Sequence, residues 1–154
     1  MGQRIAGTLD RTAINAFLEN HSTGTLALAD QNDSYAIPVG FTFAPETQDF
    51  YFRLSYGVES RKRRYIETTE RATFVVAAET ASGWKSVVAS GELEHRSTTE
   101  NVDQVTPPDR EYSDAEHERN IPFYHVFEAP SELLFTLVRL RTDELTGVAE
   151  STDV

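Results

Sequence analysis

The run from Tyr35 to Phe43 is the feature of the sequence that most restricts the fold. Large apolar residues occupy every second position of this run, and small or polar residues, Pro38 and Gly40 among them, fall between. A period of two is typical of a β-strand that buries one face. A turn-forming run, Ala-Pro-Glu-Thr-Gln-Asp, then leads into a second alternating run from Phe50 to Leu54. The two runs predict a β-hairpin. Because Pro38 cannot donate to a ladder, it predicts a sheet edge or a bulge.

The remaining runs predict further short strands and few helices. Ile14, Phe17 and Leu18 recur at helical spacing, and Asp10 or Thr12 can cap that first helix. Strands are predicted at 25–29, 73–78, 84–95 and 133–141, a further apolar segment at 123–127, and short helices from position 60 onward and at 113–121. Gly91, inside one of the strands, indicates a bulge or a close approach of two backbones.

The order of these elements predicts the fold class. Roughly six strands follow one another without βαβ alternation, which favours a mainly β, antiparallel barrel with a few short peripheral helices. A chain of 154 residues fits one domain, which we place at residues 1–147. The residues from Thr142 onward are polar, so we expect this end to fray and residues 148–154 to form a polar tail.

The charge balance bears on the environment and the partners of the protein. The formal net charge is −11, from 25 acidic and 14 basic residues, and Lys62 and Lys85 are the only lysines. Acidity with so little lysine indicates a salt-adapted cytoplasm, with an ordinary acidic protein as the alternative. The same charge argues against nucleic acid as a partner, because phosphate contacts need a basic face. No apolar run resembles a membrane helix or a signal peptide, so we expect a cytoplasmic protein without membrane contact.

A basic cluster, Arg61 to Arg64, stands against this negative charge. If a helix begins near Ser60, its first N–H groups add to the cations, and the cluster can hold a phosphate. Alternatively, the cluster is a solvated helix face that pairs with Glu59, Glu67 and Glu70.

Patterns for other kinds of chemistry are missing from the sequence. The chain has no cysteine, and its four histidines lack the spacing of a metal site, so no metal is expected. No nucleophile elbow or nucleotide-binding loop occurs, and the catalytic residues are unknown. Arg139 and Arg141 alternate on one face of the last strand. They are expected to pair with acids such as Glu92 or Glu94, although they could also bind an anion.

Four segments, in this order, resemble the pyridoxamine 5'-phosphate oxidase-like family. They are GTLALA at 24–29, YAIPVGF at 35–41, SRKRRYIE at 60–67 and WKSVVASGELE at 84–94, and the run FEAPSELLFTLVRLRTDELTG is similar to the closing strand of that family. Family members fold as FMN-binding split β-barrels and usually work as homodimers, so the resemblance implies that fold and a homodimer here. With the acidic composition, it suggests a salt-adapted archaeal member.

The resemblance also implies a cofactor site. The YAIPVGF strand would line the flavin ring, the pair Arg61 and Lys62 would hold the phosphate, and the strand from Trp84 would add contacts, some of them across the dimer interface. The candidate cofactor-binding residues are Tyr35, Pro38, Val39, Gly40, Arg61, Lys62, Trp84, Lys85, Ser86 and Val87. From residue type alone, Trp84 could equally be a core or dimer-interface aromatic.

Two classes of function are consistent with this resemblance. In the first, the protein is an FMN-dependent oxidoreductase that acts on an unidentified small molecule, with NAD(P)H as one electron donor. In the second, it is a binding module that holds FMN, a deazaflavin or haem without turnover. A deazaflavin is the alternative to FMN because its phosphate-bearing tail would use the same cations. In either class the protein orients and tunes the cofactor, which fits the absence of an evident acid–base pair.

Overall fold

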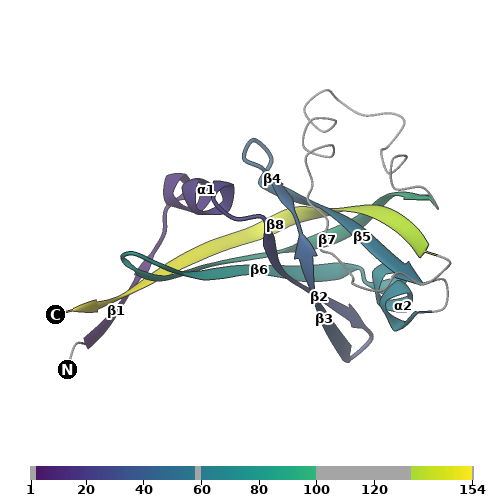
Figure 1. Cartoon of the computed structure of the whole chain (residues 1–154), viewed down its shortest axis with the longest axis horizontal. Helices are drawn as coiled ribbons and strands as arrows, with labels where there is room; N and C mark the ends of the chain where they lie inside the picture. Colours follow the sequence, from purple (N-terminus) through teal and green to yellow (C-terminus); the bar gives the residue numbers. More distant parts are fainter. Residues whose placement is uncertain (1–2, 58–59, 100–132, 154) are drawn as a thin grey trace.

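The computed structural model describes residues 3–57, 60–99 and 133–153 (Figure 1). Within those residues the chain forms eight strands and two short helices. In chain order they are β1 (Gln3–Thr8), α1 (Arg11–Glu19), β2 (Thr23–Asp30), β3 (Asp33–Gly40), β4 (Thr42–Ala44), β5 (Asp49–Gly57), α2 (Arg61–Thr68), β6 (Arg71–Thr80), β7 (Gly83–Thr99) and β8 (Leu133–Asp153). The predicted mainly β, antiparallel fold is confirmed. The elements predicted at 113–121 and 123–127 lie outside the described residues.

The strands form one antiparallel sheet in the order β3-β2-β6-β7-β8-β5-β4, and β1 pairs with the C-terminal part of β8. β3 and β4 lie at opposite edges of this order, yet only Phe41 separates them in the chain. The sheet must therefore curl until its two edges approach each other, which produces the split barrel. Pro38 lies on the edge strand β3, in agreement with its prediction.

Aromatic side chains fill the inside of the curled sheet. The ring of Phe74 lies 5.1 Å from that of Phe41, 5.1 Å from that of Phe50 and 4.8 Å from that of Phe52, measured between ring centroids. Phe41 also donates its N–H to the Ser22 carbonyl at 2.9 Å. The alternating apolar residues of the YAIPVGF run thus pack in the core, as their period of two predicted.

The predicted hairpin of 35–43 with 50–54 is only partly right. The short β4 pairs with the start of β5. β3 pairs instead with β2 over its whole length, across a turn at Gln31 and Asn32 in which Gln31 has a φ of 56°. The alternation of apolar residues shows which face of a strand is buried. It does not show which strand lies beside it, and the chain changes partners at Phe41.

The C-terminal end of the chain is a strand rather than a fraying tail. β8 continues to Asp153, paired with β7 as far as Glu150 and with β1 from Val148 to Asp153. The prediction of a polar tail is therefore wrong for residues 148–153. These residues are held because two neighbouring strands offer ladder hydrogen bonds, and polar composition does not reveal such partners.

Helix α1 covers one face of the sheet beside β8. The Asp10 carboxylate caps the helix by accepting from the Ala13 N–H at 2.8 Å, and the three predicted apolar residues are buried. The packing is close, since a β-carbon on Gly147 would lie 2.9 Å from Cγ1 of Ile14. Among the described residues, no helix has the length and apolar character needed to cross a membrane.

Candidate functional site

Helix α2 follows β5 and begins where the sequence predicted a helix. Ser60 caps it by accepting from the Arg63 N–H at 3.2 Å, and the Ser60 N–H donates to the Gly57 carbonyl at 3.1 Å. The first turn carries the basic cluster. Its leading N–H groups have no acceptor within the helix, which is the arrangement expected for an anion site.

The basic side chains of the cluster contact different partners. Lys62 is half-buried, and its Nζ donates to the Ser55 carbonyl of β5 at 2.8 Å. Burial lowers the pKa of the Lys62 amine. Arg63 pairs with Glu67 one turn along the helix, with 2.9 Å between Nε and Oε1. For Arg63, the alternative of pairing with a neighbouring glutamate is therefore what the structure shows.

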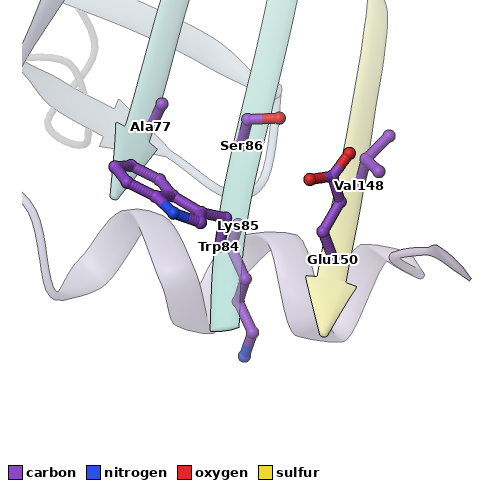
Figure 2. A pocket seen from close by; sticks show the side chains of 6 residues that line it. All are labelled: Ala77, Trp84, Lys85, Ser86, Val148 and Glu150. Atoms are coloured by element: carbon purple, nitrogen blue, oxygen red, sulfur yellow. The ribbon is translucent and has the colours of Figure 1, made fainter. Parts of the chain in front are cut away.

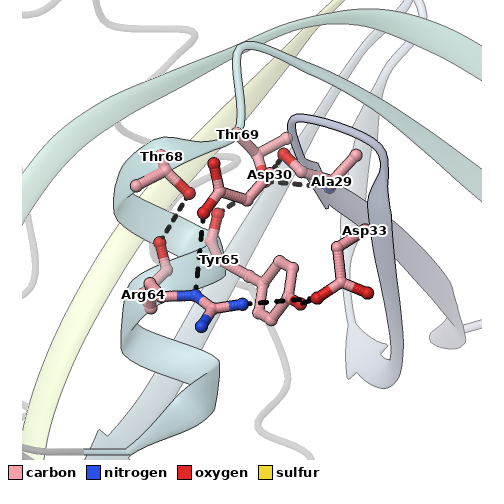
Figure 3. Close-up of polar contacts among 7 residues, drawn as sticks. All are labelled: Ala29, Asp30, Asp33, Arg64, Tyr65, Thr68 and Thr69. Carbon is pink, nitrogen blue, oxygen red and sulfur yellow. Dashed lines mark hydrogen bonds and ion pairs between the residues drawn. The ribbon is translucent and has the colours of Figure 1, made fainter.

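Arg64 belongs to a polar clamp that joins α2 to the β2–β3 hairpin (Figure 3). Its guanidinium lies 3.7 Å from the carboxylate of Asp30 and 3.5 Å from that of Asp33. Tyr65 donates its O–H to the same Asp33. Thr69, which caps the end of α2, bonds to the backbone of β2 at 3.1 Å. These contacts fix the helix against the hairpin along its length.

Arg61 is exposed and lies over two aromatic rings. Its guanidinium carbon is 5.2 Å from the ring centroid of Tyr35 and 5.6 Å from that of Tyr65, and the two rings stack at 4.9 Å. Its pKa is raised, mainly by a hydrogen bond with the Tyr65 side chain. Within the described residues, Arg61 makes no ion pair with a carboxylate. Arg61, Tyr35 and Tyr65, which we term the Arg61 cluster, therefore offer a cation to an anionic ligand.

The other candidates on β3 differ in their exposure to solvent. Pro38 is exposed, whereas Val39 and Gly40 are buried. The Val39 side chain belongs to the hydrophobic core. A ligand beside β3 could therefore meet Val39 only through its backbone.

The candidates on β7 form a second group, which we term the Trp84 pocket (Figure 2). This shallow pocket of about 300 Å³ is lined by Ala77, Trp84, Lys85, Ser86, Val148 and Glu150. Trp84 is 51% exposed, and Val88 and Val148 are also exposed, so the pocket lies in an apolar area of the sheet. Trp84 is thus not a core residue. Val87, in contrast, packs in the core and does not line the pocket.

One chain does not bring the two groups together. α2 ends just before β6 begins at Arg71, whereas Trp84 lies opposite Glu79 near the other end of β6. At 3.3 Å per residue, that stretch of β6 spans about 26 Å. Figure 1 shows α2 and the β6–β7 turn at opposite ends of the molecule. The ten predicted residues therefore do not form one site within a single chain.

Sequence patterns alone did not identify Tyr65, Asp33 and Ser55 as parts of this region. Tyr65 follows Arg61 by four positions, so the spacing of one helical turn was a usable signal. Asp33 and Ser55 carry no such signal, because they approach α2 only when the hairpin and β5 have folded.

Other charged residues form pairs away from α2. Arg141 lies 3.8 Å from Glu94, as predicted, whereas Arg139 donates to Asp49 at 2.9 Å. In the part of the chain that the structure describes, no cluster of histidine and acidic residues could hold a metal ion.

Comparison with known proteins identifies related sequences and folds. A family model described as Pyridoxamine 5'-phosphate oxidase matches residues 10–149. No curated protein sequence matches the chain.

Three solved structures share the fold at low sequence identity. A candidate pyridoxamine 5'-phosphate oxidase from Corynebacterium glutamicum is 17% identical, with a TM-score of 0.66, over 100% of this chain and 98% of that one. A protein from Mesorhizobium loti, named a FAD-binding protein, is 16% identical with a TM-score of 0.65, over 97% and 99%. The FAD binding protein from Mycobacterium smegmatis is 14% identical with a TM-score of 0.61, over 92% and 97%.

Proposed function

Since the chain belongs to the pyridoxamine 5'-phosphate oxidase family, we propose that it is a flavin-binding oxidoreductase that holds FMN at the Arg61 cluster. One observation carries the proposal: Arg61, at the start of α2, has an exposed guanidinium that lies over two tyrosine rings. Among the described residues, this guanidinium makes no ion pair with a carboxylate. A phosphate dianion suits this position, because a guanidinium and the N–H groups of a helix start both donate to phosphate oxygens.

The residues beside Arg61 suit the rest of such a ligand. Tyr35 contributes an aromatic ring beside Arg61, and the exposed Pro38 and the backbone of β3 lie along the same edge strand. When bound, FMN would supply the hydride-accepting chemistry, and the side chains would orient it and exclude water. The substrate is proposed to be a small molecule, with NAD(P)H as one electron donor.

The proposal includes a homodimer. The Trp84 pocket and the Arg61 cluster lie at opposite ends of β6, so one flavin reaches both only if the pocket comes from a second copy. The exposed side chains of Trp84, Val88 and Val148 support this, because a contiguous apolar area on a sheet face gains stability when another surface covers it. Trp84, Lys85 and Ser86 would then contact the partner's flavin.

A binding module without turnover is the second candidate. Two of the structural neighbours are named as binding proteins rather than oxidases, and both names specify FAD. FAD, a deazaflavin and haem are therefore the alternative ligands, and each has an anionic group that Arg61 could hold.

An absorption spectrum of the protein purified in molar salt tests the proposal. We expect a flavin spectrum, or one that develops when FMN is added, and bleaching when NADH or NADPH follows under anaerobic conditions. Arg61→Met is the matched variant and should retain little flavin. Bound flavin that no nicotinamide reduces would favour the binding module. If the protein binds neither FMN nor FAD, the proposal of flavin binding is refuted.

A further inference from the structure

A third group of charged residues lies on the outer face of the sheet and shares no residue with the Arg61 cluster or the Trp84 pocket. Val138 and Leu140 of β8 pack in the core. Arg139 and Arg141 alternate with them and therefore lie on the opposite face. A pocket of about 600 Å³ opens there, which we term the Arg141 pocket. Among the described residues it is lined by Thr47, Asp49, Arg71, Glu92, Arg139, Arg141, Thr142 and Asp143.

Two ion pairs hold the walls of this pocket. Arg139 donates to Asp49 at 2.9 Å, and Asp49 also accepts from the Thr142 N–H at 3.1 Å. Arg71 makes two hydrogen bonds with Asp143, at 2.7 Å and 2.9 Å. The charges of these four side chains compensate each other in pairs, so the pairs shape the pocket without giving it a net charge.

Glu92 and Arg141 are the two charged lining residues that remain. They lie opposite each other on β7 and β8, a position in which opposite charges commonly pair across strands. Arg141 instead lies 3.8 Å from Glu94, which is beyond hydrogen-bond distance. Within the described residues, Glu92 makes no hydrogen bond or ion pair. The pocket therefore presents a free carboxylate beside a weakly paired guanidinium, and both side chains are exposed.

Thr142 adds a hydroxyl group without a partner. Its Oγ1 atom is buried, and it makes no hydrogen bond to the part of the chain that the structure describes. A buried polar atom without a partner costs stability and is uncommon in folded proteins, so it needs a specific explanation. A polar ligand in the pocket provides one.

We propose that the Arg141 pocket binds a small zwitterion of the α-amino acid class. The carboxylate of the ligand accepts from Arg141, and its ammonium group donates to Glu92. Three arginines and three acidic residues line the pocket, so their summed charge favours neither a simple anion nor a simple cation. A molecule with both charges on neighbouring groups satisfies both side chains, and the Thr142 hydroxyl can donate to its carboxylate. This site is independent of the proposed flavin function.

Isothermal titration calorimetry of the full chain tests the proposal, in a buffer that contains no carboxylate or zwitterion. The probes are glycine, L-phenylalanine and L-glutamate, which share the two charged groups and differ in side chain. Acetate and methylammonium are the controls, because each carries only one of the two charges. We expect saturable binding of at least one amino acid. The two controls should bind at least about tenfold more weakly, since each loses the hydrogen bonds to one charged side chain.

These titrations have distinct outcomes. If none of the three amino acids shows saturable binding, the proposal is refuted. Acetate that binds as tightly as the amino acids would identify an anion site, and methylammonium that does so would identify a cation site. Either result would overturn the assignment to a zwitterion.

Substitutions at the two free charges locate the binding site. Glu92→Gln and Arg141→Met should each weaken amino acid binding by about tenfold or more. Both side chains are exposed, so the melting temperature of the ligand-free protein should change little. Glu144→Gln is the matched control, since it removes an exposed carboxylate of β8 that does not line the pocket. Wild-type affinity in Glu92→Gln or in Arg141→Met would overturn the site.

Thr142→Val separates binding from stability, because valine has the shape of threonine without the hydroxyl. We expect the ligand-free variant to melt at the same temperature or higher, since a buried polar atom without a partner is removed. Its affinity for the amino acid should fall by about threefold to tenfold, the value of one hydrogen bond. An unchanged affinity would overturn the role assigned to Thr142.

Discussion

Gly91 of β7 lies so close to Arg141 of β8 that a β-carbon on Gly91 would be 2.0 Å from the Arg141 carbonyl oxygen. The strand register shifts at this place, where Ser90 pairs with Glu144 but Gly91 pairs with Thr142. Asp143 is therefore the extra residue of a β-bulge, and its carboxylate reaches Arg71 on β6 at 2.7 Å. Both readings of Gly91 from the sequence, a bulge and a close approach, are confirmed.

The first prediction concerns this contact. Gly91→Ala should destabilise the fold by about 2 kcal/mol or more, because backbone atoms rather than a flexible side chain obstruct the new methyl group. Urea unfolding measures the effect. Gly7→Ala is the matched control, since a β-carbon there meets nothing within 4 Å. An equal loss of stability in Gly91→Ala and Gly7→Ala would contradict the close approach of the two backbones at Gly91.

The second prediction compares two ion pairs. Asp49 is 5% exposed and accepts from Arg139 at 2.9 Å and from the Thr142 N–H at 3.1 Å. Removal of one partner leaves a buried charge, so Arg139→Met should destabilise the protein by about 3 kcal/mol.

The exposed pair of Arg71 and Asp143 provides the control for that comparison. Arg71→Met should change stability by about 1 kcal/mol or less, because water screens the charges. Denaturant midpoints of the two variants, measured in the same buffer, test the ranking. A larger loss of stability in Arg71→Met than in Arg139→Met would contradict this prediction.

The third prediction concerns Trp84. Its side chain is half exposed, so Trp84→Ala should leave the thermal unfolding of an isolated chain nearly unchanged but weaken the proposed dimer and its flavin retention. Sedimentation velocity over a concentration series measures the dimer. Glu19→Ala, on the exposed end of α1, is the control and should leave assembly unaltered. A Trp84→Ala protein with the same assembly and flavin content would argue against the two-chain site.

The fourth prediction concerns alkaline pH. Burial lowers the folded-state pKa of Lys62, so below that pKa the folded chain carries the full penalty of a partly desolvated charge. As the pH rises from the lowered pKa towards the unfolded value of about 10.4, the folded state loses its proton first, and wild type should gain stability relative to Lys62→Met. Unfolding free energies of both proteins across this window test the sign. A difference that stays constant or falls would contradict it.

The fifth prediction concerns salt. The protein has a formal net charge of −11, so its surface carboxylates repel one another. Salt should relieve this repulsion, because the Debye length falls from about 10 Å at 0.1 M to about 3 Å at 1 M. The melting temperature should therefore rise over this range in KCl. Sucrose at matched osmolality is the control for a general solute effect. A melting temperature that falls with KCl would refute salt adaptation.

Local patterns predicted the elements whose causes are local. The spacing of Ile14, Phe17 and Leu18 predicted α1, and Ser60 predicted the start of α2. Both signals are local, because the residues on the buried face of a helix and its capping residue are close together in the sequence. The period of two placed the strands and their buried faces for the same reason. The motif order also led to the family, which the match over residues 10–149 confirms.

The assignment of strand partners required the tertiary structure. β3 pairs with β2 rather than with β5, and the polar end of β8 is ordered by β1 and β7. Ladder hydrogen bonds join backbone groups that every residue but proline possesses, so the side chains of one strand carry little information about its neighbour.

The sequence by itself determined the periodicity, the caps, the antiparallel class and the family of this protein, because each depends on residues that are near one another in the chain or on an ordered set of motifs. Only the tertiary structure decided that Lys62 faces Ser55 while Arg61 faces two tyrosines, and that the Arg61 cluster and the Trp84 pocket lie apart. The direction of a side chain and its distance from residues on other strands depend on how the whole sheet curls, and no local pattern specifies that curvature.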